Sequence, residues 1–148
     1  MKALDLYFCS FSNFSKPFRN NEHLYKQAQT FWSQLDNAAW VAFGLAVVIG
    51  AGMAVFYYTA YNNMSGRHYK PKFWWIFMAL ALVATSVVTL VVELMLASPK
   101  LDGAFWVEFK IALINMAYAL IPFLLTSLAW CNFHFPTNAY RYLKFFKS

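Results

Sequence analysis

A single carboxylate lies inside a long apolar stretch of this sequence. Residues 73–97 contain Glu93 as their only charged side chain. Ionisable groups inside a membrane-spanning helix are costly, and they usually hold helices together or handle ions and protons. Lys110 and Asn115, near the start of the next apolar stretch, are expected at a similar depth. Three interpretations stay open for this intramembrane polar group: a structural pair between two spans, an ion or proton site, and a carboxylate that reaches water.

Residues that could support other chemistry are scattered. His23, His68 and His134 show no metal-ligand spacing, and the sequence has neither an HExxH motif nor a Gly-rich phosphate loop. An intramembrane protease needs a Ser/His or a two-Asp arrangement in its spans, and the three apolar stretches contain no His or Asp. We therefore expect no enzyme activity, no catalytic residue, no metal site and no cofactor.

Three apolar stretches determine the expected fold. The chain has 148 residues, of which 61% are hydrophobic and only 12% charged, against about 25% charged in an ordinary soluble domain. About 20 apolar residues cross a bilayer core as a helix. The sequence predicts an all-α integral membrane protein with three transmembrane helices at about residues 38–60, 73–97 and 106–130.

The segments outside the spans are too short to bury a core of their own. We expect a juxtamembrane segment at 1–37, a three-span domain at 38–130 and a basic, aromatic interfacial tail at 131–148. Within 1–37, Asn20 or Asn21 can cap a short amphipathic helix that ends at Leu35, with a break at Asp36 and Asn37. Before it, apolar residues recur every three or four positions: Leu4, Phe8, Phe11, Phe14 and Phe18. That strip fits either the headgroup region or a partner subunit.

Small residues recur every four positions in two of the spans. The first helix-packing stripe consists of Ala38, Ala42, Ala46, Gly50 and Ala54. The second consists of Ala81, Thr85 and Thr89 and continues through Glu93 and Ala97. Such stripes let helix backbones approach closely, and a partner helix can follow them only with a right-handed crossing. In the third span the expected small face is Asn115, Ala119, Pro122, Thr126 and Ala129. Three tyrosines that end the first span, Tyr57, Tyr58 and Tyr61, suggest an interfacial aromatic belt.

The net charge of +6 favours anionic lipid headgroups as partners and not nucleic acid, because the basic residues flank the spans. With three spans, one side carries Lys2, Lys16, Arg19, Lys26, Lys100 and Lys110, and the other carries Arg67, Lys70, Lys72, Arg141, Lys144 and Lys147. Without the distant Lys2 and Lys16 the comparison is four against six, which predicts the N-terminus outside and the C-terminus inside. Cys9 and Cys131 then lie on opposite sides and are not expected to pair.

These features lead to two hypotheses about function. The first is a non-catalytic membrane subunit that anchors or scaffolds a larger complex with other membrane-protein subunits, such as a secretion machine or a respiratory-type assembly. A bacterial or mitochondrial inner membrane fits this hypothesis. The second is a small homo-oligomeric channel, transporter or pore-forming protein that uses the small-residue stripe for assembly and Glu93 and Thr89 to line a path.

Overall fold

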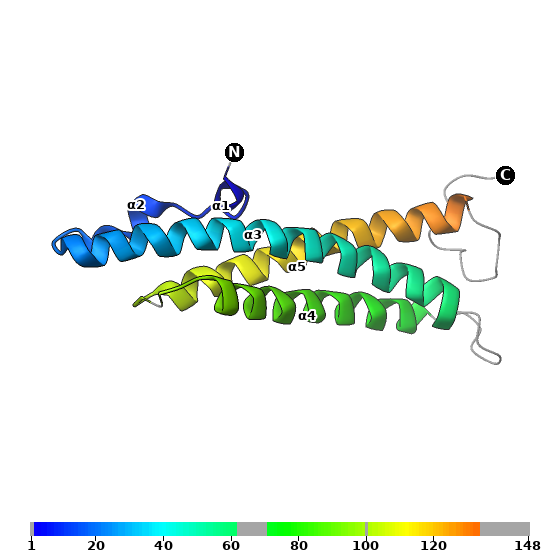
Figure 1. The fold of residues 1–148 in the computed structure, drawn as a ribbon. Coiled ribbons are helices and arrows are strands. Elements are labelled where there is room, and N and C mark those ends of the chain that lie inside the picture. Colours follow the sequence, from blue (N-terminus) through cyan, green and yellow to red (C-terminus); the bar gives the residue numbers. More distant parts are fainter. Residues whose placement is uncertain (1, 62–70, 100, 134–148) are drawn as a thin grey trace. The chain divides into compact units, whose positions relative to one another are not determined.

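The computed structural model of the chain describes residues 2–61, 71–99 and 101–133, and all regular structure in these ranges is helical (Figure 1). The elements in chain order are α1 (Ala3–Leu6), α2 (Phe11–Phe14), the 3-10 turn η1 (Lys16–Phe18), α3 (Glu22–Phe56), the π-helical turn η2 (Tyr57–Tyr61), α4 (Pro71–Leu96) and α5 (Ala104–Phe133). Predictions for the 62–70 loop, including His68, and for His134 and the rest of the tail lie outside the described residues.

Three helices are long and apolar enough to cross a membrane: Glu22–Tyr61, Lys72–Leu96 and Ala104–Phe133. With 26 residues, α4 is about 39 Å long at 1.5 Å per residue, more than a hydrocarbon core of about 30 Å. Its ends follow from local chemistry, because Pro71 occupies the first helical position and Pro99 follows closely after Leu96. Gly103 precedes α5 at φ +83°, a conformation that glycine adopts without the usual steric penalty. The prediction of three apolar helices is confirmed.

The predicted break at Asp36 and Asn37 is wrong, because α3 runs without interruption from Glu22 to Phe56. The Asp36 carboxylate accepts a hydrogen bond from the Leu4 backbone N–H at 3.0 Å, so it does not compete for the backbone of its own helix. Leu35 and Ala38 on either side are buried. Packing against the N-terminal residues thus carries the helix through two weak helix formers.

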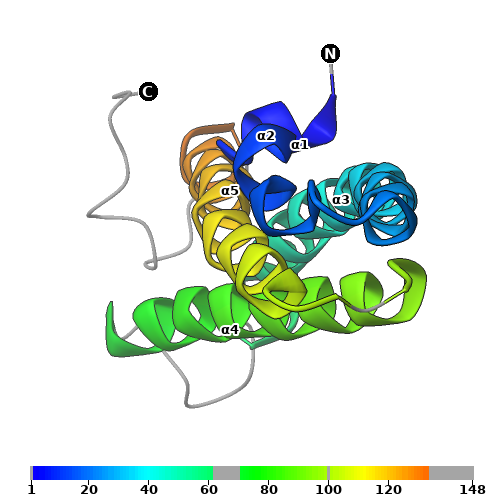
Figure 2. The same ribbon diagram turned by 90° about the vertical axis from the view of Figure 1, so that its left-hand side faces the viewer.

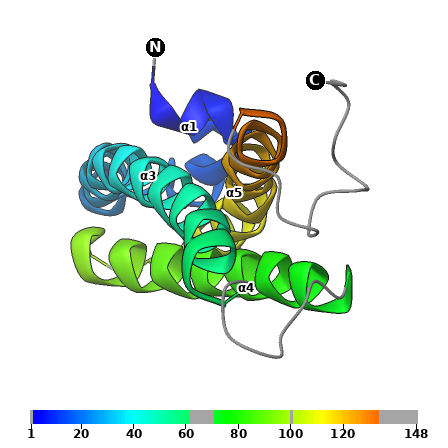
Figure 3. The same ribbon diagram turned by 90° about the vertical axis from the view of Figure 1, so that its right-hand side faces the viewer.

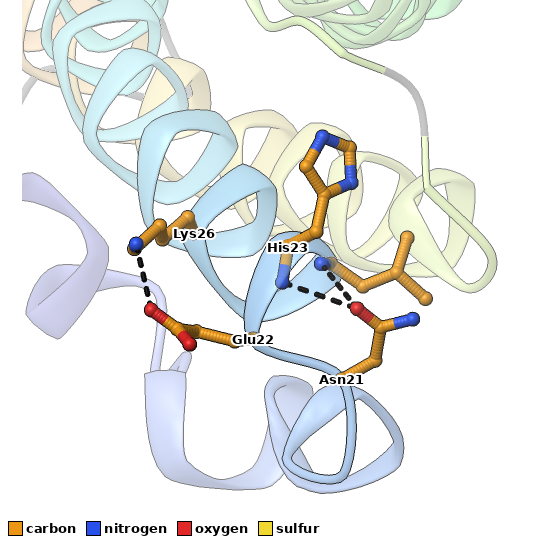
Figure 4. A network of polar contacts seen from close by, with 5 residues as sticks. Asn21, Glu22, His23 and Lys26 are labelled. Atoms are coloured by element: carbon orange, nitrogen blue, oxygen red, sulfur yellow. Dashed lines mark hydrogen bonds and ion pairs between the residues drawn. The ribbon is translucent and has the colours of Figure 1, made fainter.

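The start of α3 follows the expected capping pattern (Figure 4). The Asn21 side-chain oxygen accepts hydrogen bonds from the backbone N–H groups of His23 at 3.1 Å and Leu24 at 3.3 Å. Glu22 in the first turn forms an exposed ion pair with Lys26 at 2.7 Å. A side-chain cap and an acidic first turn both favour a helix beginning here.

The chain divides into two compact units, each of which contains parts of all three long helices. Unit 1 comprises Met1–Leu45 and Ser86–Asn115, and unit 2 comprises Ala46–Thr85 and Met116–Ser148. In unit 1, residues 2–21 form an N-terminal segment that lies against α3 and α5 (Figure 2). In unit 2, the second half of α3 packs with the first half of α4 and the second half of α5 (Figure 3).

Candidate functional site

The small residues of the first span are buried inside the chain. Ala42, Ala46 and Ala54 are fully buried and Ala38 is 1% exposed. A Cβ placed on Gly50 would overlap the Ala119 carbonyl oxygen and would come within 2.9 Å of the Pro122 side chain. The α3 and α5 backbones therefore approach each other closely at Gly50, within unit 2, as a small-residue stripe permits.

The α4 stripe is also internal, and its two threonines use their hydroxyl groups differently. Ala81, Thr85, Thr89, Glu93 and Ala97 are all at most 1% exposed. The Thr85 hydroxyl donates to the Ala81 carbonyl of its own helix at 2.8 Å, and the Thr89 hydroxyl accepts a bond from Asn115 on α5. One threonine thus satisfies its hydroxyl locally and the other links two helices.

The buried face of α5 differs from the predicted one in its second half. Asn115 and Ala119 are buried as expected, but Ala129 is exposed, and Pro122 and Thr126 are half-buried. The buried positions continue instead at steps of four residues, through Phe123, Ser127 and Cys131. Phe123 and Cys131 were missed because the sequence pattern selected small and weakly polar residues only.

Asn115 is the centre of a buried hydrogen-bond network in unit 1. Its side-chain oxygen accepts from the Tyr7 hydroxyl at 2.7 Å, and its amide nitrogen donates to the Thr89 hydroxyl at 2.9 Å. All three side chains are at most 1% exposed, and the Tyr7 hydroxyl also lies 3.4 Å from the Ala39 carbonyl oxygen. The network ties the N-terminal segment to α5 and α4 at once.

Tyr7 was not singled out by the sequence pattern. The predicted apolar strip of the N-terminal segment includes Phe8 and not Tyr7, yet Tyr7 is fully buried and Phe8 is 81% exposed. A single helix cannot run through this segment, because Phe8 has φ 53°, and non-glycine residues adopt such values mostly in turns. The predicted docking strip therefore packs partly on the chain itself: Phe14 contacts the rings of Phe31 and Trp32.

Two carboxylates are buried in unit 1. Glu93 is fully buried, and Glu108, which the sequence did not single out, is 1% exposed. The bond between Thr89 and Asn115 sets the register of α4 and α5. Glu93 lies four residues after Thr89 and Glu108 seven residues before Asn115, so their levels along the helix axes differ by about 4.5 Å. The two carboxylates thus occupy one end of the α4–α5 pair.

Lys110 contacts the N-terminal segment. Its ammonium nitrogen donates to the Phe8 carbonyl oxygen at 2.7 Å. Burial raises the pKa of the nearby Cys9 thiol, while the positive charge of Lys110 lowers it and Glu93 raises it. Cys9 therefore lies within electrostatic reach of both residues. In the ranges that the structure describes, no group of three or more His, Cys, Asp or Glu side chains could hold a metal ion.

Unit 2 has an aromatic core at the end of α3. Tyr57 and Tyr58 are 1% and 2% exposed, so these two members of the predicted interfacial belt pack within the chain and do not face outward. The Trp74 indole donates to the Ser127 hydroxyl at 3.3 Å, and the Cys131 thiol donates to the Tyr58 hydroxyl at 3.6 Å. The Tyr57 ring packs against Phe77 of α4, and the Tyr58 ring stacks on Trp130 of α5.

Open grooves lie on the surface of unit 1. One, of about 460 Å³, runs along α3 and is lined by residues that include Lys2, Phe11, Gln29, Trp32 and Asp36. Another, of about 350 Å³, lies between the N-terminal segment, α3 and the first turns of α5. Trp32 lines both.

Comparisons with known proteins found no relative of this chain. The sequence matches no protein-family model, and no curated protein or solved structure was found to be similar to it.

Proposed function

We propose that this chain is an integral membrane protein that serves as a non-catalytic subunit and anchors or scaffolds a larger multi-protein complex. The observation that carries the proposal is the use of Asn115, which donates to Thr89 and accepts from Tyr7. Buried hydrogen bonds of this kind fasten helices together. They favour a structural role for the polar residues over a conducting one.

The outward surfaces of the helices suit contact with lipid and with other membrane subunits. Large apolar side chains are exposed along all three long helices, including Trp40, Val48, Trp75, Leu80, Val87 and Leu125. An apolar surface of this extent needs a membrane or a partner to cover it. A secretion machine or a respiratory-type assembly in an inner membrane would provide both.

The proposed orientation has the N-terminus outside and the C-terminus inside. It rests on the count of flanking basic residues. That count assumes that the N-terminal segment and the start of α5 lie on one side of the membrane. The hydrogen bond from Lys110 to the Phe8 carbonyl supports this assumption.

A tagged full-length protein, extracted in mild detergent and studied by native mass spectrometry, tests the scaffold. We expect stoichiometric complexes with different membrane proteins. In cells that lack this chain, those partners should run as smaller species on native gels, and the wild-type gene should restore the complex. A homo-oligomer or a monomer with unchanged partners would contradict the proposal.

A small channel or transporter remains the second candidate, because two carboxylates are buried in unit 1. The substitution Glu93→Gln separates the two functions. A structural Glu93 predicts lower stability or impaired assembly, and a conducting Glu93 predicts normal assembly with altered ion flux in liposomes. Glu22→Gln is the matched control, since the Glu22 side chain is 82% exposed and forms a surface ion pair with Lys26 one turn along α3.

A further inference from the structure

The groove of about 350 Å³ on unit 1 combines aromatic walls with a cation. Its lining includes Phe8, Ser10, Phe14, Trp32, Trp106 and Lys110. These residues come from three places in the chain: the N-terminal segment, the first half of α3 and the first turns of α5. Figure 2 shows α2 beside α3 and α5 at this end of the unit.

Lys110 is held at the edge of the groove with donors to spare. Its ammonium group has three N–H donors, and one of them donates a hydrogen bond to the Phe8 carbonyl oxygen at 2.7 Å. The lysine is exposed, so the remaining donors are accessible. This fixed position lowers the entropic cost of using the side chain to bind an anion.

The side chains that line the groove carry a net positive charge. Cys9 also lines it, and burial raises the pKa of this thiol above its ordinary value, so the thiol stays neutral at pH 7. Glu93 acts on the same thiol, but its side chain is fully buried and does not line the groove. The charge that a ligand meets is therefore that of Lys110.

The position of the groove along α5 matches the level of lipid headgroups. Lys110 directly precedes the apolar residues 111–130. One turn earlier, the Trp106 side chain is 70% exposed. Tryptophan and lysine at the end of an apolar helical stretch are typical of the membrane–water interface.

We propose that this groove binds an anionic phospholipid of the surrounding bilayer. Lys110 would bind the phosphate, and the rings of Trp106 and Phe8 would pack against the glycerol and the first methylene groups. Basic pockets beside membrane helices are suited to anionic headgroups. The site adds a specific ligand to the chain and does not depend on the scaffold function.

Native mass spectrometry of the purified full-length protein tests this site with three probes: phosphatidylglycerol, phosphatidylcholine and water-soluble glycerol phosphate. We expect phosphatidylglycerol to be retained about fivefold better than phosphatidylcholine, the factor expected for one basic residue near an anionic membrane surface. Lys110→Gln should reduce this ratio to about one, and Lys110→Arg should preserve it.

Lys72→Gln is the matched control, because Lys72 is an exposed lysine at the start of α4 that lies 5.2 Å from the centre of the Phe73 ring. It removes the same charge beside an aromatic ring in the other unit, outside this groove, and should lower the ratio much less than Lys110→Gln does. Trp106→Ala provides a second variant in case Lys110→Gln does not fold, because the Trp106 side chain is largely exposed. This substitution should also lower phosphatidylglycerol retention.

Three outcomes would overturn the lipid site. The first is equal retention of the two lipids by the wild-type protein. The second is an equal loss in Lys72→Gln and Lys110→Gln. The third is binding of glycerol phosphate as strong as that of phosphatidylglycerol, which would assign the groove to a free anion.

Discussion

Gly50 gives the sharpest test of how the helices pack in unit 2. A Cβ at this position would overlap the Ala119 carbonyl oxygen, a backbone atom that cannot rotate away. Either α3 or α5 must then shift. Overpacking of this kind costs about 1–3 kcal/mol, while the exchange of glycine for alanine in a helix gains about 1 kcal/mol in propensity.

Gly52 is the matched control for this substitution. It lies two residues further along α3, and a Cβ there would meet nothing within 4 Å. Gly52→Ala and Gly50→Ala share the same gain in helix propensity, so the difference between them isolates the steric clash. We expect Gly50→Ala to be about 1–3 kcal/mol less stable than Gly52→Ala, with the cost of the clash as the reason.

Unfolding by sodium dodecyl sulfate in mixed micelles, followed by circular dichroism, measures both variants against the wild-type protein. Gly52→Ala should unfold at the wild-type detergent fraction or above it, and Gly50→Ala should unfold at a clearly lower fraction than Gly52→Ala. If the two variants unfold at the same detergent fraction, the close approach of α3 and α5 at Gly50 is refuted.

Two further predictions concern the N-terminal segment. Tyr7→Phe removes the hydroxyl that donates to Asn115 at 2.7 Å and should lower stability by about 1–2 kcal/mol, because a buried acceptor loses its partner. Tyr25→Phe is the control, at a half-buried tyrosine of the same unit. Equal effects of the two substitutions in the micelle unfolding assay would contradict the role of Tyr7. Burial raises the pKa of the Cys9 thiol and Lys110 opposes that rise, so maleimide labelling, which needs the thiolate, should require a higher pH than for an ordinary cysteine with pKa about 8.5. Lys110→Gln should move the labelling midpoint to still higher pH, and a move to lower pH would refute this reading of the charges.

Much of the helical arrangement could be predicted from spacing alone. The α3 and α4 stripes stand out because small residues recur every four positions, with Glu93 as the exception on α4, and these positions are buried. On α5 the same spacing of buried residues passes through Phe123 and Cys131. Phe123 is large and apolar and breaks the rule of small polar residues, so the continuation follows only from the register already set by Asn115 and Ala119.

The contacts of the N-terminal segment were beyond the reach of sequence patterns. Asn115 could be recognised as a polar residue in a span, but its partner Tyr7 is 108 positions away. Lys110 likewise donates to a backbone carbonyl at Phe8, and any residue there would provide that acceptor. Asp36 looked like a helix break because its tertiary partner, the Leu4 N–H, leaves no local signature.

The bond between Tyr7 and Asn115 also imposes an order on biogenesis. Tyr7 leaves the ribosome before its acceptor, which is made 108 residues later. At about 5–20 residues per second this interval is on the order of 10 s. During that time the apolar residues of the segment must be kept from other partners, by the membrane surface or by a chaperone. The N-terminal segment can therefore form this contact only after α5 has been made, and a chain that still lacks α5 presents a different surface from the mature protein.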